Sequence, residues 1–215
     1  MLDPQAAILL KLMEDNRIPP VYTQAPEQAR EAYRARRSFS QPDPPEVGAV
    51  SDHEISANGA RFMVRQYQPL TRSAAALPAL VYYHGGGWTI GDLDTHDVLC
   101  RSLCAQTGMV VVAVDYRMGP EHRFPAAYLD SVAAFEWTVH QAAALGIDPR
   151  RIAVGDKNGI LRQVVENGGG LVKKQRQVVL DPRRGQSLAD VLVDAGLGGV
   201  TVQPFAPTAA KGCSR

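Results

Sequence analysis

The sequence predicts an α/β protein with one mostly parallel sheet, and three observations support this fold class. Short apolar runs alternate with longer segments of helical periodicity from residue 79 onward, as in parallel strands joined by crossover helices. Residues 110–114 read Val-Val-Val-Ala-Val, a β-branched run typical of a strand covered on both faces. An antiparallel hairpin comes first in the chain, which predicts a mixed sheet whose first strands lie at its edge.

Helices are expected at the start of the chain. Asp3 and Pro4 are suited to be the N-cap and first residue of a helix, and apolar residues follow at helical spacing. A second helix is expected from Pro26 to about Arg37. Three prolines between residues 42 and 45 then end this helical opening, because proline cannot continue a helix.

The remaining elements follow from turn and capping signals. Asn58-Gly59 predicts a type I′ turn between strands 53–57 and 61–67, because both central residues of that turn need positive φ. Two further strands are expected at 79–83 and 152–154. One helix should begin with Thr95 as N-cap and stop at Gly108. Another is expected over 125–145, closed by Gly146.

Composition excludes several functional classes. The formal net charge is +1, so the whole chain offers no electrostatic argument for nucleic acid or an anionic membrane. No apolar run approaches the roughly 20 residues that span a bilayer, and no signal peptide is recognised. Three cysteines are too few and unpaired for a disulfide framework, so we expect a reducing, cytoplasmic setting, with Cys100 and Cys104 as small core residues. No metal ion or organic cofactor is indicated.

The first chemical signal is the segment His84-Gly85-Gly86-Gly87-Trp88, directly after a buried strand. Three glycines let the backbone approach another group closely, and their N–H groups can point at one developing oxyanion. A glycine-rich turn without a ligand explains the same residues. A phosphate loop is less suitable, because the Gly-x-x-x-x-Gly-Lys-Ser/Thr motif is absent.

A second motif gives the glycine segment its context. Asp115-Tyr116-Arg117-Met118-Gly119-Pro120-Glu121-His122-Arg123-Phe124-Pro125-Ala126 follows at a distance of about 30 residues. The two motifs together resemble those of the bacterial hormone-sensitive-lipase-like carboxylesterases of the α/β-hydrolase superfamily. The resemblance covers roughly residues 1–156. It implies the α/β-hydrolase fold, with helices over the active site formed by residues 1–45, a core at 46–156 and a divergent or shortened segment at 157–215.

The resemblance also implies roles for individual residues. Gly85 and Gly86, with Asn158, would donate backbone N–H groups to the oxyanion. His84 would orient the loop and Trp88 would shape the wall of the pocket. Arg117, Glu121, His122 and Asp130 are interpreted as a structural network rather than as catalytic groups, because a charged cluster at a strand end needs pairing in any fold.

The nucleophile motif is altered. The family turns after this strand with Gly-Asp-Ser-Ala-Gly, whereas this chain reads Gly155-Asp156-Lys157-Asn158-Gly159. Lys157 therefore occupies the nucleophile position, and no acyl-serine can form there. Attack by the lysine itself would leave an amide that does not turn over. An ordinary turn after a strand explains the same residues.

The residues after the motif preserve one further trace of the family. Val178-Val179-Leu180-Asp181-Pro182 resembles the strand that carries the triad acid, which makes Asp181 the candidate acid, although a chance match is equally consistent. No histidine follows His140, so no base is expected beside a nucleophile. A rearranged or frameshifted reading frame beyond residue 157 would explain the abrupt change as well.

The sequence supports two functional hypotheses. The first is a carboxylic ester hydrolase by descent, acting on small-molecule acyl esters but impaired because the nucleophilic serine and the triad histidine are missing. The second is a non-catalytic member of the same family that binds esters or a partner. Since the fold would be incomplete, exposed sheet edges also predict poor solubility or self-association. Neither nucleic acid nor a membrane is an expected partner.

Overall fold

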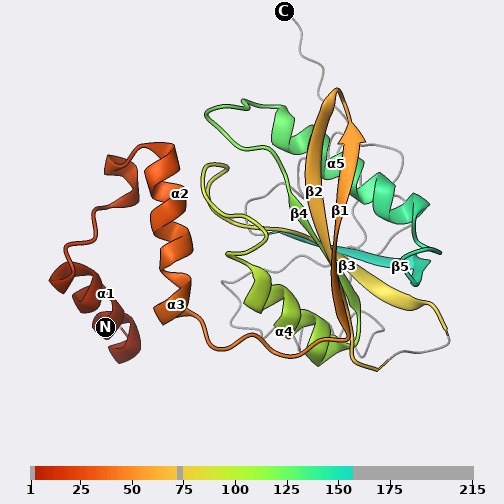
Figure 1. The fold of residues 1–215 in the computed structure, drawn as a ribbon, viewed down its shortest axis with the longest axis horizontal. Helices are drawn as coiled ribbons and strands as arrows, with labels where there is room; N and C mark the ends of the chain where they lie inside the picture. The colour runs from red at the N-terminus through yellow and green to blue at the C-terminus, as the bar shows by residue number, and fades with distance from the viewer. Residues whose placement is uncertain (1–2, 72–74, 157–215) are drawn as a thin grey trace, which may run out of the picture.

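A computed structural model describes residues 3–71 and 75–156, which form one five-stranded sheet with helices on both faces and at one side (Figure 1). Its elements, in chain order, are α1 (Pro4–Asp15), a 3₁₀ turn (Val21–Thr23), α2 (Pro26–Ala35), α3 (Arg37–Ser40), β1 (Ala49–Ala57), β2 (Ala60–Gln68), β3 (Leu77–Tyr83), α4 (Asp97–Thr107), β4 (Val110–Asp115), α5 (Ala126–His140) and β5 (Ile147–Asp156).

The strand order is β1-β2-β4-β3-β5. β2 is antiparallel to both of its neighbours, while β3 is parallel to β4 and to β5. Four of the five strands therefore point the same way, which confirms the mostly parallel sheet. The turn at Asn58 and Gly59 has φ angles of 52° and 71°, so the predicted hairpin is confirmed, and its strand β1 forms an edge.

The two faces of the sheet carry separate cores. On β4, Val110, Val112 and Val114 pack toward α5, whereas Val111 and Ala113 pack toward α4. Alternating side chains point to opposite faces of a strand, and both faces are covered, so every position of this run is apolar. Each fully buried valine stabilises the fold by about 1.5–3 kcal/mol relative to an exposed one.

Two helix boundaries differ from the sequence prediction. α4 begins at Asp97 with His96 as N-cap, because the Thr95 hydroxyl accepts a hydrogen bond from the Asp92 N–H at 2.8 Å instead of capping a helix. α5 ends at His140 rather than at residue 145. The chain then turns through Gly146, whose φ is 71°, and β5 starts five residues earlier than predicted.

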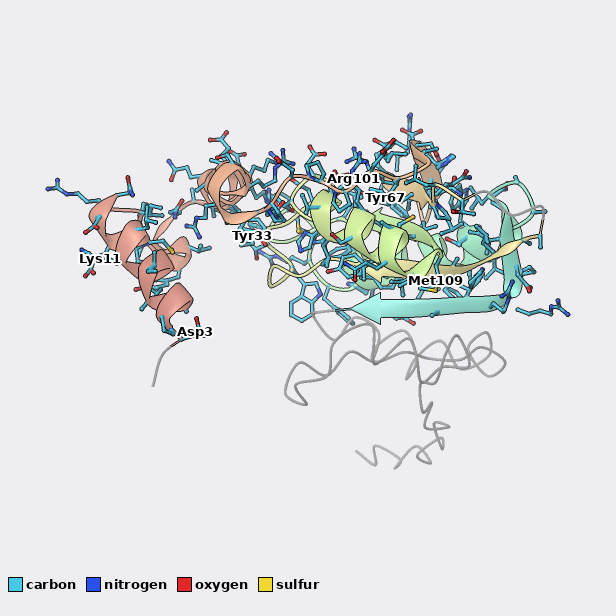
Figure 2. All side chains as sticks on the ribbon, turned by 90° about the horizontal axis from the view of Figure 1, so that it is seen from below. Asp3, Lys11, Tyr33, Tyr67, Arg101 and Met109 are labelled. Carbon is cyan, nitrogen blue, oxygen red and sulfur yellow. The ribbon has the colours of Figure 1, made fainter. Side chains whose placement is uncertain are left out.

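The N-terminal helices lie beside the sheet, where α2 approaches the loops that follow β3 and β4 (Figure 1). Asp3 caps α1 as predicted, since its carboxylate accepts a hydrogen bond from the Ala6 N–H. Tyr33 points from α2 toward the body of the protein (Figure 2), with its ring centroid 6.4 Å from that of His96. None of the described helices is both long and apolar enough to cross a bilayer.

Candidate active site

The candidate site lies at the carboxyl ends of β3 and β5. Tyr83 pairs with Asp156 at the last position of these parallel strands, so residue 84 leaves the sheet beside the end of β5. In open α/β sheets, ligands bind outside the carboxyl ends of the strands. The oxyanion-loop candidates belong to the described part of this region, whereas Lys157, Asn158 and Asp181 lie outside the described residues.

The loop after β3 folds into a tight turn that requires glycine. Gly86 has a φ of 135° and Gly87 a φ of 62°, a region that side chains rarely adopt. The Gly86 carbonyl accepts hydrogen bonds from the N–H groups of Thr89 and Ile90, at 3.2 and 3.1 Å. A Cβ atom on Gly86 would lie 1.8 Å from the Ile90 carbonyl oxygen, so this turn excludes every other residue type.

The N–H groups of Gly85, Gly86 and Gly87 have no hydrogen-bond acceptor among the residues that the structure describes. Gly85 is buried, Gly86 is half-buried and Gly87 is exposed, so the series runs from the protein interior to the surface. Unsatisfied backbone donors in a half-buried turn favour a negatively charged or strongly polar oxygen. This is the chemistry that an oxyanion loop needs.

His84 lies under the loop and is almost completely buried. Its Nδ1 is 2.9 Å from the Gly85 carbonyl oxygen. Tyr116 stacks on the imidazole with 4.4 Å between ring centroids, and its hydroxyl donates to the His84 carbonyl at 2.6 Å. A Cβ on Gly91 would lie 2.5 Å from Nδ1, so the imidazole occupies the space that the missing side chain leaves.

Trp88 forms the outer corner of the loop. It adopts a φ of 57°, which is uncommon for a bulky residue, and the residue remains 39% exposed. The Trp88 carbonyl accepts a hydrogen bond of 2.8 Å from the Gly119 N–H. The loop after β3 is thereby tied to the loop after β4, and the indole is left available to a ligand at the surface.

Arg30 on α2 was not among the predicted site residues, yet it contacts both loops. Its Nε donates to the Thr89 carbonyl at 2.8 Å, and its Nη2 donates to the Gly119 carbonyl at 2.9 Å. The same guanidinium forms a bidentate pair with Glu121, at 2.9 and 2.7 Å. No sequence signal identifies these contacts, because the partners lie 59 to 91 residues away.

The predicted charged network is confirmed for Arg117 and Asp130. Asp130 is completely buried, and its carboxylate accepts two hydrogen bonds from the Arg117 guanidinium and one from its backbone N–H, at 2.8–2.9 Å. Glu121 belongs to a different pair, since it binds Arg30. Both pairs hold the segment that follows β4, which supports a structural interpretation of these charges.

A hollow of about 460 Å³ lies between α2 and the carboxyl end of β4. Arginines and carboxylates line most of it, including Arg30, Arg61, Asp92 and Glu121, with Met63 and Met118 among the apolar residues. Asp115 contributes a carboxyl whose pKa is raised to about 6 by burial and by the neighbouring Asp92. In the described residues, no group of three or more His, Cys, Asp or Glu side chains is arranged to hold a metal ion.

Comparisons with known proteins indicate the family of the chain. Residues 80–159 match the family model of the α/β hydrolase fold. Ethyl acetate hydrolase from Pseudomonas putida is 38% identical over an alignment of 165 residues, which covers 74% of this chain and 52% of that protein. The carboxylesterase NlhH from Mycobacterium tuberculosis is 49% identical over 100 residues, 44% of this chain and 31% of that protein.

A solved structure extends the likeness to the architecture. The ester hydrolase EH1AB1, from the metagenome of Lake Arreo, superposes with a TM-score of 0.73 at 32% identity, covering 91% of this chain and 66% of that one. The chain spans about half the length of the first curated relatives or less. The sequence, the sheet order and these matches establish that the chain belongs to the α/β-hydrolase fold family, in its hormone-sensitive-lipase-like branch.

Proposed function

We propose that this chain binds short-chain acyl esters at the loop 84–88, in a site descended from a serine carboxylesterase. One observation carries the proposal: the Gly85, Gly86 and Gly87 N–H groups have no acceptor among the described residues and lie where β3 ends beside β5. The relatives named as ethyl acetate hydrolase and carboxylesterase support an ester as the ligand. No cofactor or metal ion enters this proposal.

The loop would act on the carbonyl oxygen of the ester. Attack on the carbonyl carbon moves negative charge onto that oxygen, and each aligned donor stabilises the resulting oxyanion by about 3–4 kcal/mol. Gly85 and Gly86 would supply these donors, with Asn158 as a third. His84 would orient the loop from below, and Trp88 would form the wall on the solvent side.

The residue after Asp156 decides whether this stabilisation leads to turnover. Lys157 offers no hydroxyl for an acyl-enzyme, and the 215 residues contain no histidine after His140 to take a proton from a nucleophile. We therefore expect ester binding with hydrolysis at the background rate, even with Asp181 present as a candidate triad acid. The sparse cysteines favour a cytoplasmic setting, and self-association through a sheet edge is part of the same proposal.

Hydrolysis and binding must be measured separately. Purified chain of confirmed intact mass is incubated with p-nitrophenyl butyrate, and binding of ethyl butyrate is followed by NMR titration. Trp88→Ala should weaken the binding. Leu70→Ala is the matched control, because Leu70 is exposed but follows β2 at the opposite end of the sheet. A background rate with saturable binding supports the proposal.

Two results would contradict it. Robust hydrolysis that survives Lys157→Ala would mean that another residue is the nucleophile and that the chain is an active esterase. The absence of saturable ester binding, with the fold intact, would mean that the glycine segment is only a turn.

A further inference from the structure

Arg30 holds two successive loops from one position on α2. It donates to the Thr89 carbonyl in the loop after β3 and to the Gly119 carbonyl in the loop after β4. Gly119 in turn donates its N–H to the Trp88 carbonyl. The Trp88 carbonyl thus accepts from the Gly119 N–H, and the Thr89 carbonyl accepts from the Arg30 guanidinium. Since the same guanidinium also donates to the Gly119 carbonyl, these contacts form a closed ring.

The ring holds one end of the turn that orients the glycine N–H groups. The N–H groups of Thr89 and Ile90 both donate to the Gly86 carbonyl, so a displacement of Thr89 would turn the peptide that carries the Gly87 N–H. The glycines themselves cannot resist such a displacement, because they lack the side chains that restrict φ and ψ. A rigid contact at Thr89 therefore determines where the donors point.

Arginine suits this position better than lysine. Its planar guanidinium presents donors in a fixed fork, whereas an ammonium is a point charge on a flexible stem. Here the Nε, Nη1 and Nη2 atoms are all used, since Nε binds Thr89, Nη1 binds Glu121, and Nη2 binds both Gly119 and Glu121. Glu121 holds the plane of the fork in place by accepting two of these bonds.

We propose that Arg30 is a positioning residue: it transmits the placement of α2 to the oxyanion loop and fixes the direction of the Gly85–Gly87 N–H groups. The inference rests on the proposed function of that loop. Through Arg30, the N-terminal helices contribute to preorganisation of the site as well as covering it. The ligand class remains an ester carbonyl, whose oxygen would accept hydrogen bonds from the fixed N–H donors.

The alternative role for an arginine at this place is simple attachment of α2 to the body of the protein. Arg34 provides the matched control. It lies one turn further along α2 and pairs with Asp92, so it also attaches the helix. However, it donates to neither Thr89 nor Gly119 in the structure. Attachment alone would give Arg30 and Arg34 similar effects, whereas positioning would not.

The test is amide hydrogen exchange in the full chain, followed residue by residue by NMR, with no ester present. Arg30→Ala should accelerate exchange at Thr89, Ile90 and Gly119 about ten-fold, as expected for loss of about one hydrogen bond's stabilisation. The Val112 amide in the middle of β4 reports global opening and should keep its rate. Arg34→Ala should leave the three loop amides unchanged.

Arg30→Lys separates charge from geometry. It keeps a cation beside Glu121, so the melting temperature should stay near that of the wild type, while the loop amides should exchange as fast as in Arg30→Ala. If Arg30→Ala fails to fold, Arg30→Lys alone decides: accelerated loop amides with an unchanged Val112 rate support the proposal. Loop amides that keep their rates, or that accelerate equally in Arg34→Ala, overturn it. Because no ester is present, these outcomes do not depend on whether the chain binds esters.

Discussion

Tyr83 and Asp156 lie opposite each other at the final register position of β3 and β5. This pairing brings the residue before the glycine motif and the residue before Lys157 to the same end of the sheet, although 73 residues separate Tyr83 from Asp156 in the sequence. Since the two strands pair in parallel up to this position, Tyr83 and Asp156 cannot separate without breaking the ladder. In the sequence, the glycine motif follows the first of these positions and the altered nucleophile motif continues beyond the second.

Gly86→Ala should destabilise the protein by about 2–4 kcal/mol, because the new Cβ meets a backbone carbonyl that cannot move away independently. Urea unfolding would measure this loss. Gly87→Ala is the control: its φ is also positive, but a Cβ there has open space, so only about 1 kcal/mol is expected. Equal losses of stability in the two variants would show that the backbone shifts and relieves the contact between the new Cβ and the Ile90 carbonyl.

Asp130→Ala should cost about 3–5 kcal/mol, because it leaves the Arg117 guanidinium without its partner in a half-buried position. Thermal or urea unfolding would detect the change. Asp15→Ala removes an exposed ion pair with Lys11 on α1 and should change stability by less than about 0.5 kcal/mol. A small loss in Asp130→Ala would mean that the loop after β4 is held by other contacts.

Asp115 should give the stability a distinct pH dependence. Its folded-state pKa is raised to about 6, so the folded protein retains a proton that the unfolded chain releases near pH 4. Its stabilising contribution is fully present below pH 4 and is lost as the pH rises to 6. Asp115→Asn removes this loss and should raise the stability at pH 7, relative to that at pH 4, by about 3 kcal/mol.

Urea denaturation of the wild type and Asp115→Asn at several pH values would measure the difference. The difference should grow between pH 4 and 6 and then stay constant. A difference that is independent of pH would show that the carboxyl titrates normally in the folded protein.

The buried thiols should be unreactive in the folded protein. Burial raises the pKa of Cys104 to about 11 and raises that of Cys100 as well, so almost no thiolate exists at pH 8. In Cys213→Ser, which leaves these two thiols, labelling by a disulfide reagent should follow the rate of opening. Adding urea should restore rapid labelling, and immediate labelling without urea would contradict the burial of α4 against the sheet.

Lys157→Ser should not restore ester hydrolysis by more than about ten-fold over background, because a serine hydroxyl without a base is a weak nucleophile. The p-nitrophenyl butyrate assay would measure this, with Lys157→Ala as the control for removal of the lysine. A large gain in the serine variant alone would reveal a base that the sequence does not indicate.

Local chemistry made much of the fold predictable, and distant contacts account for most of the rest. Asn58-Gly59 identified its hairpin, because the positive φ angles are properties of those two residues. Thr95 was expected to cap α4, but a hydrogen bond from the Asp92 N–H engages its hydroxyl. The start of β5 was placed too late, because Ile147 reaches the sheet through pairing with Leu77, 70 residues earlier.

The candidate site shows the same division. The family motif identified Gly85, Gly86, His84 and Trp88, since these residues are contiguous and their spacing is distinctive. Arg30 was missed because nothing in an amphipathic helix indicates which of its arginines meets a carbonyl 59 residues away. The apolar spacing in α1 also did not indicate which side chains are buried, because Ile8, Leu10 and Leu12 are exposed.

The packing of His84 against Gly91 and Tyr116 has a consequence for which substitutions the protein can accept during evolution. The contacts that shape the loop after β3 also fill the protein interior beneath it. A substitution that disrupts the loop therefore also destabilises the fold. Arg30, Tyr116 and Gly119 take part in these contacts, and none of the three belongs to the nucleophile motif. The glycine motif therefore serves folding directly, and its presence in a sequence is not by itself evidence of catalysis.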